Sequence, residues 1–100
     1  MTKRLVVTAA ARDDLRVIGR TTAETWGLDQ RARYLARIRE RFIQLRNTPG
    51  LGHARDDIRP SYRSIPIGRH VVFYREAGDL IEIIRVLHDR MDLRRHLADL

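Results

Sequence analysis

Residues 62–97 constrain the fold of this chain more than any other stretch. They contain three runs of β-branched and aromatic residues, which are typical of strands, and two short glycine-containing segments between them. The predicted strands and turns are, in order, 62–67, 68–69, 70–75, 76–79 and 80–87. Because the connections are short, each strand should pair with the next in an antiparallel meander.

The last predicted strand, LIEIIRVL at residues 80–87, is apolar on both faces. Such a strand is typical of the interior of a sheet that is covered on both sides. Glu82 and Arg85 interrupt the apolar run, and the alternation of side chains places them on opposite faces. We expect Arg85 on the same face as Ile81 and Ile83.

A guanidinium on that face needs a partner, because a buried unpaired charge costs several kcal/mol. Either Arg85 forms a structural ion pair or it reaches a groove in which it recognises an anion. The expected structural partners are Glu76, Asp89 and Asp92.

Two amphipathic helices precede the meander. After a short strand at 4–7, Thr8 fits an N-cap and Gly27 fits the end of the first helix. The second helix fits an N-cap at Asp29 and must end before Pro49. The inward faces predicted from the helical spacing are Ala11, Leu15, Ile18, Thr22 and Trp26 in the first helix, and Leu35, Ile38, Phe42 and Leu45 in the second.

Residues 51–60 are polar and are predicted to form a loop. At the other end of the chain, Asp89 fits the N-cap of a short basic helix that turns Met91, Leu97 and Leu100 inward. The predicted fold is therefore a single α+β domain over residues 1–100. It has an N-terminal helical hairpin packed on a small antiparallel sheet, and a short C-terminal helix.

The net charge of +7 comes almost entirely from arginine, since Lys3 is the only lysine. Such a surface predicts an acidic partner, either a nucleic acid or an acidic polypeptide. The chain has no cysteine and no apolar run long enough to span a membrane, and Arg12 interrupts any N-terminal signal sequence. We therefore expect a soluble cytoplasmic protein with no membrane association.

Histidines are the main candidates for chemistry. The four are too scattered to predict a metal site, and no motif indicates a cofactor. A metal-free ribonuclease would need a base and cations, which His88, Arg69 and Arg85 could supply. A lone histidine at a strand end more commonly has only a structural role.

Several segments together resemble the ParE toxins of type II toxin–antitoxin modules, within the RelE/ParE superfamily. In the helical part the resemblance rests on Trp26-Gly27 and the Pro49-Gly50 turn. In the meander and tail it rests on Tyr62-Arg63-Ser64, GRHVVFYR at 68–75, IIRVLH at 83–88, Arg90-Met91-Asp92 and Arg95-His96-Leu97. The resemblance implies the same α+β fold and a non-enzymatic toxin that inhibits DNA gyrase. It also implies a ParD-like antitoxin with an acidic C-terminal segment, held in a toxin–antitoxin hetero-oligomer.

The resemblance also suggests site residues. The C-terminal segment would act on gyrase, through His88, Arg90, Arg94, Arg95 and His96. The hairpin and sheet would bind the antitoxin, through Leu15, Trp26, Tyr34, Arg37, Arg41, Arg69, Tyr74 and Arg85.

Two alternatives stay open at this point. A RelE-like enzyme, which cleaves mRNA on the ribosome, would use His88, Arg69 and Arg85. The C-terminal helix has no tyrosine of the kind those nucleases use, which favours ParE. A basic DNA-binding module would also fit the charge, although no recognition-helix pattern is present.

Overall fold

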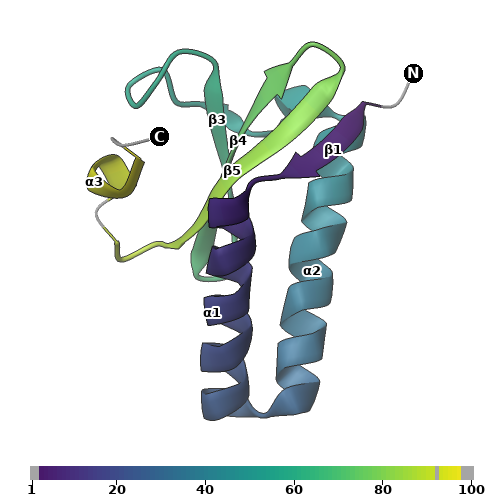
Figure 1. The fold of residues 1–100 in the computed structure, drawn as a ribbon, viewed down its shortest axis with the longest axis vertical. Helices are drawn as coiled ribbons and strands as arrows, with labels where there is room; N and C mark the ends of the chain where they lie inside the picture. Colours follow the sequence, from purple (N-terminus) through teal and green to yellow (C-terminus); the bar gives the residue numbers. More distant parts are fainter. Residues whose placement is uncertain (1–2, 92, 98–100) are drawn as a thin grey trace.

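The computed structural model describes residues 3–91 and 93–97 (Figure 1). The helices are α1 (Ala9–Trp26), α2 (Leu28–Asn47), the single 3-10 turn η1 (Pro49–Leu51) and α3 (Leu93–Leu97). The strands are β1 (Arg4–Val7), β2 (His53–Ala54), β3 (Tyr62–Ile67), β4 (His70–Ala77) and β5 (Leu80–His88). No helix within these residues is long and apolar enough to cross a membrane.

The α+β prediction is confirmed, with two changes in the sheet. The described residues form a five-stranded sheet in the order β1-β5-β4-β3-β2, and β3, β4 and β5 make the expected antiparallel meander. However, β1 pairs parallel to β5, with Val7 opposite Ile83, so the sheet is mixed. The predicted loop at 51–60 also contains η1 and the short edge strand β2.

The first helix of the hairpin begins and ends where the sequence predicts. The Thr8 hydroxyl accepts a hydrogen bond from the Ala11 amide at 3.1 Å and donates one to the Ile84 carbonyl at 2.9 Å, which ties the start of α1 to β5. Gly27 joins the two helices with φ 91°, a conformation that favours glycine. Asp29 therefore lies in the first turn of α2, and its prediction as the N-cap was wrong.

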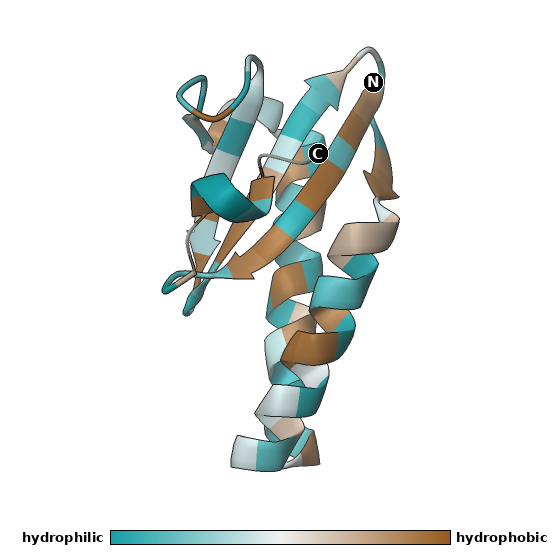
Figure 2. Cartoon of the chain, turned by 60° about the vertical axis from the view of Figure 1, so that its left-hand side comes forward, coloured by the Kyte–Doolittle hydropathy of each residue, from teal (hydrophilic) through white to brown (hydrophobic). Residues whose placement is uncertain are grey.

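Two apolar clusters hold the sheet between the hairpin and α3. The larger cluster lies under the hairpin and includes the buried Ile38, Phe42, Leu45, Ile81 and Ile83. The smaller cluster lies on the other face and is built from Tyr62, Phe73, Ile84, Leu87 and Leu97. Figure 2 shows the hydrophobic run along β1 and β5 in brown. The expectation that β5 is covered on both faces is confirmed.

An extra residue in β5 changes which way its side chains point. Phe73 pairs with Arg85 and Tyr74 with Ile83, so Ile84 has no partner across the ladder and forms a bulge. Past this bulge the alternation is reversed. The register therefore places Arg85 on the α3 face together with Glu82, and its predicted position beside Ile81 and Ile83 was wrong.

Other expectations fail at the ends of elements. Trp26 was predicted to face inward, but it is 72% exposed because the end of the hairpin extends past the sheet (Figure 1). Met91 is 43% exposed, and Asp89 lies within the turn that follows β5 rather than at the start of α3. The second hairpin turn is shorter than predicted, with only Gly78 and Asp79 between β4 and β5. Leu97 is buried as expected, whereas Leu100 and Asp92 lie outside the described residues.

Candidate functional site

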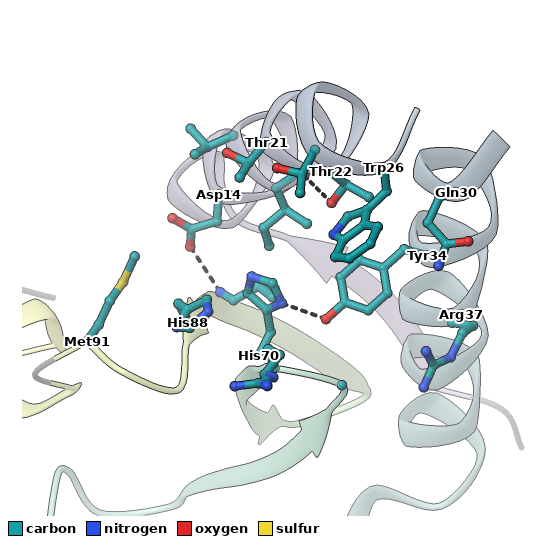
Figure 3. A pocket seen from close by; sticks show the side chains of 16 residues that line it. Asp14, Thr21, Thr22, Trp26, Gln30, Tyr34, Arg37, His70, His88 and Met91 are labelled. Atoms are coloured by element: carbon teal, nitrogen blue, oxygen red, sulfur yellow. Dashed lines mark hydrogen bonds between the residues drawn. The ribbon is translucent and has the colours of Figure 1, made fainter. Parts of the chain in front are cut away.

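A groove of about 670 Å³ runs between the helical hairpin and the end of the sheet (Figure 3). Its walls are one side of α1 and the first half of α2, and its floor is the β3–β4 turn with the end of β5. The residues that line it are Asp14, Val17, Ile18, Thr21, Thr22, Thr25, Trp26, Gln30, Tyr34, Arg37, Gly68, Arg69, His70, Val86, His88 and Met91.

Apolar side chains stay exposed along this groove. Val17 is 49% exposed, and both Trp26 and Met91 also keep much of their surface open. Arg37 and Arg69, both exposed, line the same groove. A concave apolar strip bordered by positive charge is typical of a site for an amphipathic, acidic peptide segment.

The β3–β4 turn shapes the floor of the groove. Gly68 has φ 54°, and a Cβ atom there would lie 2.7 Å from the Tyr34 hydroxyl oxygen. Without that side chain, the Tyr34 hydroxyl approaches the Ile67 carbonyl oxygen to 3.0 Å. The glycine therefore allows α2 to be anchored to the end of the sheet.

Three aromatic side chains meet above this turn. The Tyr34 hydroxyl oxygen lies 2.6 Å from Nδ1 of His70, and the rings of His70 and His88 contact edge to face with centroids 5.2 Å apart. Burial raises the pKa of Tyr34, although the backbone of Arg69 and the charge of Arg37 oppose the change. Burial and the neighbouring His88 lower the pKa of His70, so this imidazole is neutral at neutral pH.

Asp14 lines the groove next to β5. Its carboxylate accepts from Nε and Nη2 of Arg85 at 2.7 and 2.8 Å, and from the Val86 amide at 3.0 Å. This hydrogen bonding raises the pKa of Arg85. The expected partners Glu76, Asp89 and Asp92 were therefore wrong, and Arg85 also reaches the His96 carbonyl at 3.4 Å.

The structure divides the residues predicted to contact an antitoxin into two sets. Trp26, Tyr34, Arg37 and Arg69 line the groove together. The others have contacts elsewhere: Leu15 packs on the hairpin cluster, Arg41 donates to Gln44, Tyr74 binds the backbone of Pro49 and Gly52, and Arg85 binds Asp14.

The residues predicted to act on a target are also separated. His88 faces the groove, whereas Arg94, Arg95 and His96 are exposed on α3, on the other side of the sheet (Figure 1). Arg90 is exposed in the segment between β5 and α3. Arg94 lies 3.3 Å from Asp57, and Arg95 also interacts with a neighbouring group.

The structure also separates the set proposed for a nuclease. His88 and Arg69 share the groove, but the Arg85 guanidinium is bound by Asp14 and its side chain is only 19% exposed. Arg85 is therefore poorly placed to bind a phosphate. Among the residues that the structure describes, no three histidine or acidic side chains gather as metal ligands would.

Sequence reasoning missed two residues of this site. Asp14 was not singled out within the first predicted helix, because its partner Arg85 lies 71 residues further along the chain. His70 was assigned only to a strand, although it follows the tight turn that Tyr34 contacts.

Comparisons with known proteins agree with one another. The family described as "ParE toxin of type II toxin-antitoxin system, parDE" matches residues 5–93. "Toxin ParE1" of Mycobacterium tuberculosis (strain H37Rv) is 39% identical over 98 residues, covering 97% of this chain and 100% of that protein. "Toxin ParE" of Escherichia coli is 35% identical over 95 residues, covering 94% of this chain and 92% of that protein.

A solved structure also has this fold. It is titled "Chromosomal ParDE TA system from P. aeruginosa" and superimposes with a TM-score of 0.76 at 21% sequence identity. The match covers 87% of this chain and 96% of that one. The fold of this chain is thus a known one.

Proposed function

This chain belongs to the family of ParE toxins of type II toxin–antitoxin systems, and from that premise we propose that it inhibits DNA gyrase and is neutralised by a ParD-like antitoxin. It would act in the cytoplasm as a binding protein that catalyses no reaction of its own. The observation that carries the proposal is the open apolar groove beside the hairpin in a chain of this family.

The groove fits the acidic segment expected of the antitoxin. Its exposed Val17 and Trp26 offer a surface for the apolar face of a helix, and Arg37 and Arg69 offer charges for the acidic face. The net charge of +7 favours association with such a partner. The solved complex named ParDE supports a partner of this kind.

Replacing Val17 with glutamate should weaken antitoxin binding. Val17 is half-exposed on α1, so the new carboxylate would enter the groove without disturbing the core and would repel an acidic helix. We expect a loss of about 2 kcal/mol, as for a central interface residue, or about thirtyfold in Kd. Isothermal titration with the antitoxin encoded beside this chain measures it.

Leu28→Glu is the matched control. Leu28 is 70% exposed at the corner of the hairpin and does not line the groove. The Leu28→Glu substitution introduces the same negative charge as Val17→Glu, but outside the groove. Antitoxin binding should therefore change less than twofold. Equal losses in the two variants would show that the groove is not the antitoxin site.

The segment proposed to act on gyrase is α3. Leu93 and Leu97 attach it to the sheet on the face opposite the hairpin, and Arg94, Arg95 and His96 remain exposed. This position leaves the groove and α3 as separate surfaces.

Removing Arg94 and Arg95 together should weaken poisoning of gyrase while the chain stays folded. Arg94 makes a surface ion pair with Asp57, and such pairs contribute little to stability. With purified gyrase and supercoiled plasmid, the wild-type chain should trap cleaved DNA, and the double alanine variant should need at least tenfold more protein. Arg33→Ala with Arg39→Ala removes the same charge from exposed positions of α2 and should leave cleavage unchanged.

The same experiments test the alternative function. A ribosome-dependent endonuclease would cut messenger RNA at codon-linked positions, which primer extension detects, and would lose the cuts in His88→Ala. Growth arrest with intact transcripts would exclude it. Supercoiling that continues at high toxin excess would contradict the gyrase proposal.

A further inference from the structure

The floor of the groove holds one histidine in a defined protonation state. The Ile67 carbonyl oxygen can only accept, so the Tyr34 hydroxyl donates its proton there at 3.0 Å. The Tyr34 oxygen is then the acceptor for His70, whose Nδ1 lies 2.6 Å away and must carry a proton. This assigns Nδ1–H to the neutral His70 and leaves its Nε2 free to take up a second proton.

The second histidine has two alternative partners at one atom. Nδ1 of His88 lies 3.1 Å from the Arg90 amide, which requires an unprotonated nitrogen, and 3.2 Å from Oδ1 of Asp89, which requires a protonated one. Neutral His88 therefore accepts from Arg90 and carries its proton on Nε2, as a donor. Charged His88 can instead pair with Asp89.

The charged groups around the two rings leave room for a further anion. From α1, Asp14 is already bound by Arg85 and the Val86 amide. From α2, Tyr34 is neutral, and Arg37 lies over its ring with 5.7 Å from guanidinium carbon to centroid. Asp89 lies next to His88, and Arg69 lines the same groove as the two rings.

Positive charge on both rings of the empty groove is unfavourable. The ring centroids are 5.2 Å apart, and burial together with the charge of His88 lowers the pKa of His70. A carboxylate placed against the two rings would reverse this balance, because an opposite charge within hydrogen-bonding reach favours the imidazolium form.

We propose that Arg69, His70 and His88 form a subsite for a carboxylate side chain of the segment that occupies the groove, and that filling this subsite takes up a proton. The proposal rests on the proposed antitoxin-binding function and adds a chemical requirement to it. The acidic partner should carry a glutamate or aspartate that reaches the β3–β4 turn, and its binding should depend on pH near neutrality.

The sign of the effect follows from the linkage between proton binding and ligand binding. Burial and His88 lower the pKa of His70 in the free chain, and a bound carboxylate would raise it. Binding should therefore strengthen as the pH falls through the pKa that His70 has in the complex. One unit of pKa difference corresponds to tenfold in affinity. We expect the Kd for the antitoxin polypeptide encoded beside this chain to fall about three- to tenfold from pH 8 to pH 6.

Isothermal titration of the whole chain tests this, first at pH 8, where binding itself tests the proposed function. Buffers of different ionisation enthalpy then report proton uptake, which should be positive for the wild-type chain. The double variant His70→Gln, His88→Gln should still bind at pH 8, with a Kd that changes less than twofold down to pH 6. His53→Gln, on the exposed strand β2, should behave as wild type.

The outcomes separate the two proposals. No binding at pH 8 by the folded wild-type chain would contradict the proposed function. Binding without proton uptake, or a pH dependence that survives in the double variant, would overturn the carboxylate subsite alone. If the double variant unfolds, as circular dichroism would show, His88→Gln alone replaces it and should at least halve the pH dependence.

Discussion

Replacing Ile83 with aspartate is expected to leave the chain without a cooperatively folded core at 25 °C. Ile83 is fully buried in the hairpin cluster, paired with Tyr74 on one side and Val7 on the other. The change removes an aliphatic side chain, worth about 2–3 kcal/mol, and buries a carboxyl group without a partner, at a cost of several kcal/mol more. The sum is comparable to the roughly 5–15 kcal/mol that holds a domain together.

Circular dichroism and thermal unfolding measure this effect. Ile43→Asp makes the same substitution at a position on α2 that is 38% exposed, and it should cost less than about 1 kcal/mol. A cooperative transition in Ile83→Asp within a few degrees of wild type would show that β5 is not the centre of the core.

Asp14→Ala should produce the second-largest loss. The substitution leaves both the Arg85 guanidinium and the Val86 amide without their acceptor, and both side chains of the ion pair are mostly buried, at 13% exposed for Asp14 and 19% for Arg85. Breaking such a pair costs about 3 kcal/mol, the low end of the range for fully buried pairs. For a chain of this size the melting temperature should fall by about 15 °C.

The neighbouring residue gives the control. Asp13 makes only a surface pair with Arg16, with both side chains more than half exposed, so Asp13→Ala should change stability by less than about 0.5 kcal/mol. Asp14→Asn should fall between the two, because an amide oxygen can still accept from Val86. Equal stability of the Asp13 and Asp14 variants would mean that the ion pair contributes nothing.

Local signals in the sequence were enough to predict most of the fold. Thr8 and Gly27 mark the ends of α1 through hydrogen-bonding and backbone preferences that act within a few residues. The bounds of β1 and β3 follow from runs of β-branched residues next to turn residues. Asp29 was misassigned because Gly27 serves both helices, a sharing that a cap preference cannot reveal.

Features that depend on distant residues could not be predicted in this way. The bulge at Ile84 reverses the side-chain alternation of β5, and nothing in LIEIIRVL marks it. The partner of Arg85 depends on how α1 crosses the sheet, so acids close to Arg85 in the sequence were expected in place of Asp14. Helical spacing predicted that Trp26 faces inward, but Trp26 is exposed. The spacing of residues in a helix does not indicate how far the sheet extends beneath that helix. The groove was only partly predicted for the same reason.

The parallel pairing of β1 with β5 has a consequence for synthesis of the chain. Residues 4–7 leave the ribosome well before residues 80–83, which form the strand that they join. Closing so long a loop is slow compared with forming the hairpin or the meander. A nascent chain thus cannot complete its sheet, or the surfaces built on the sheet's end, until residues 80–83 have emerged.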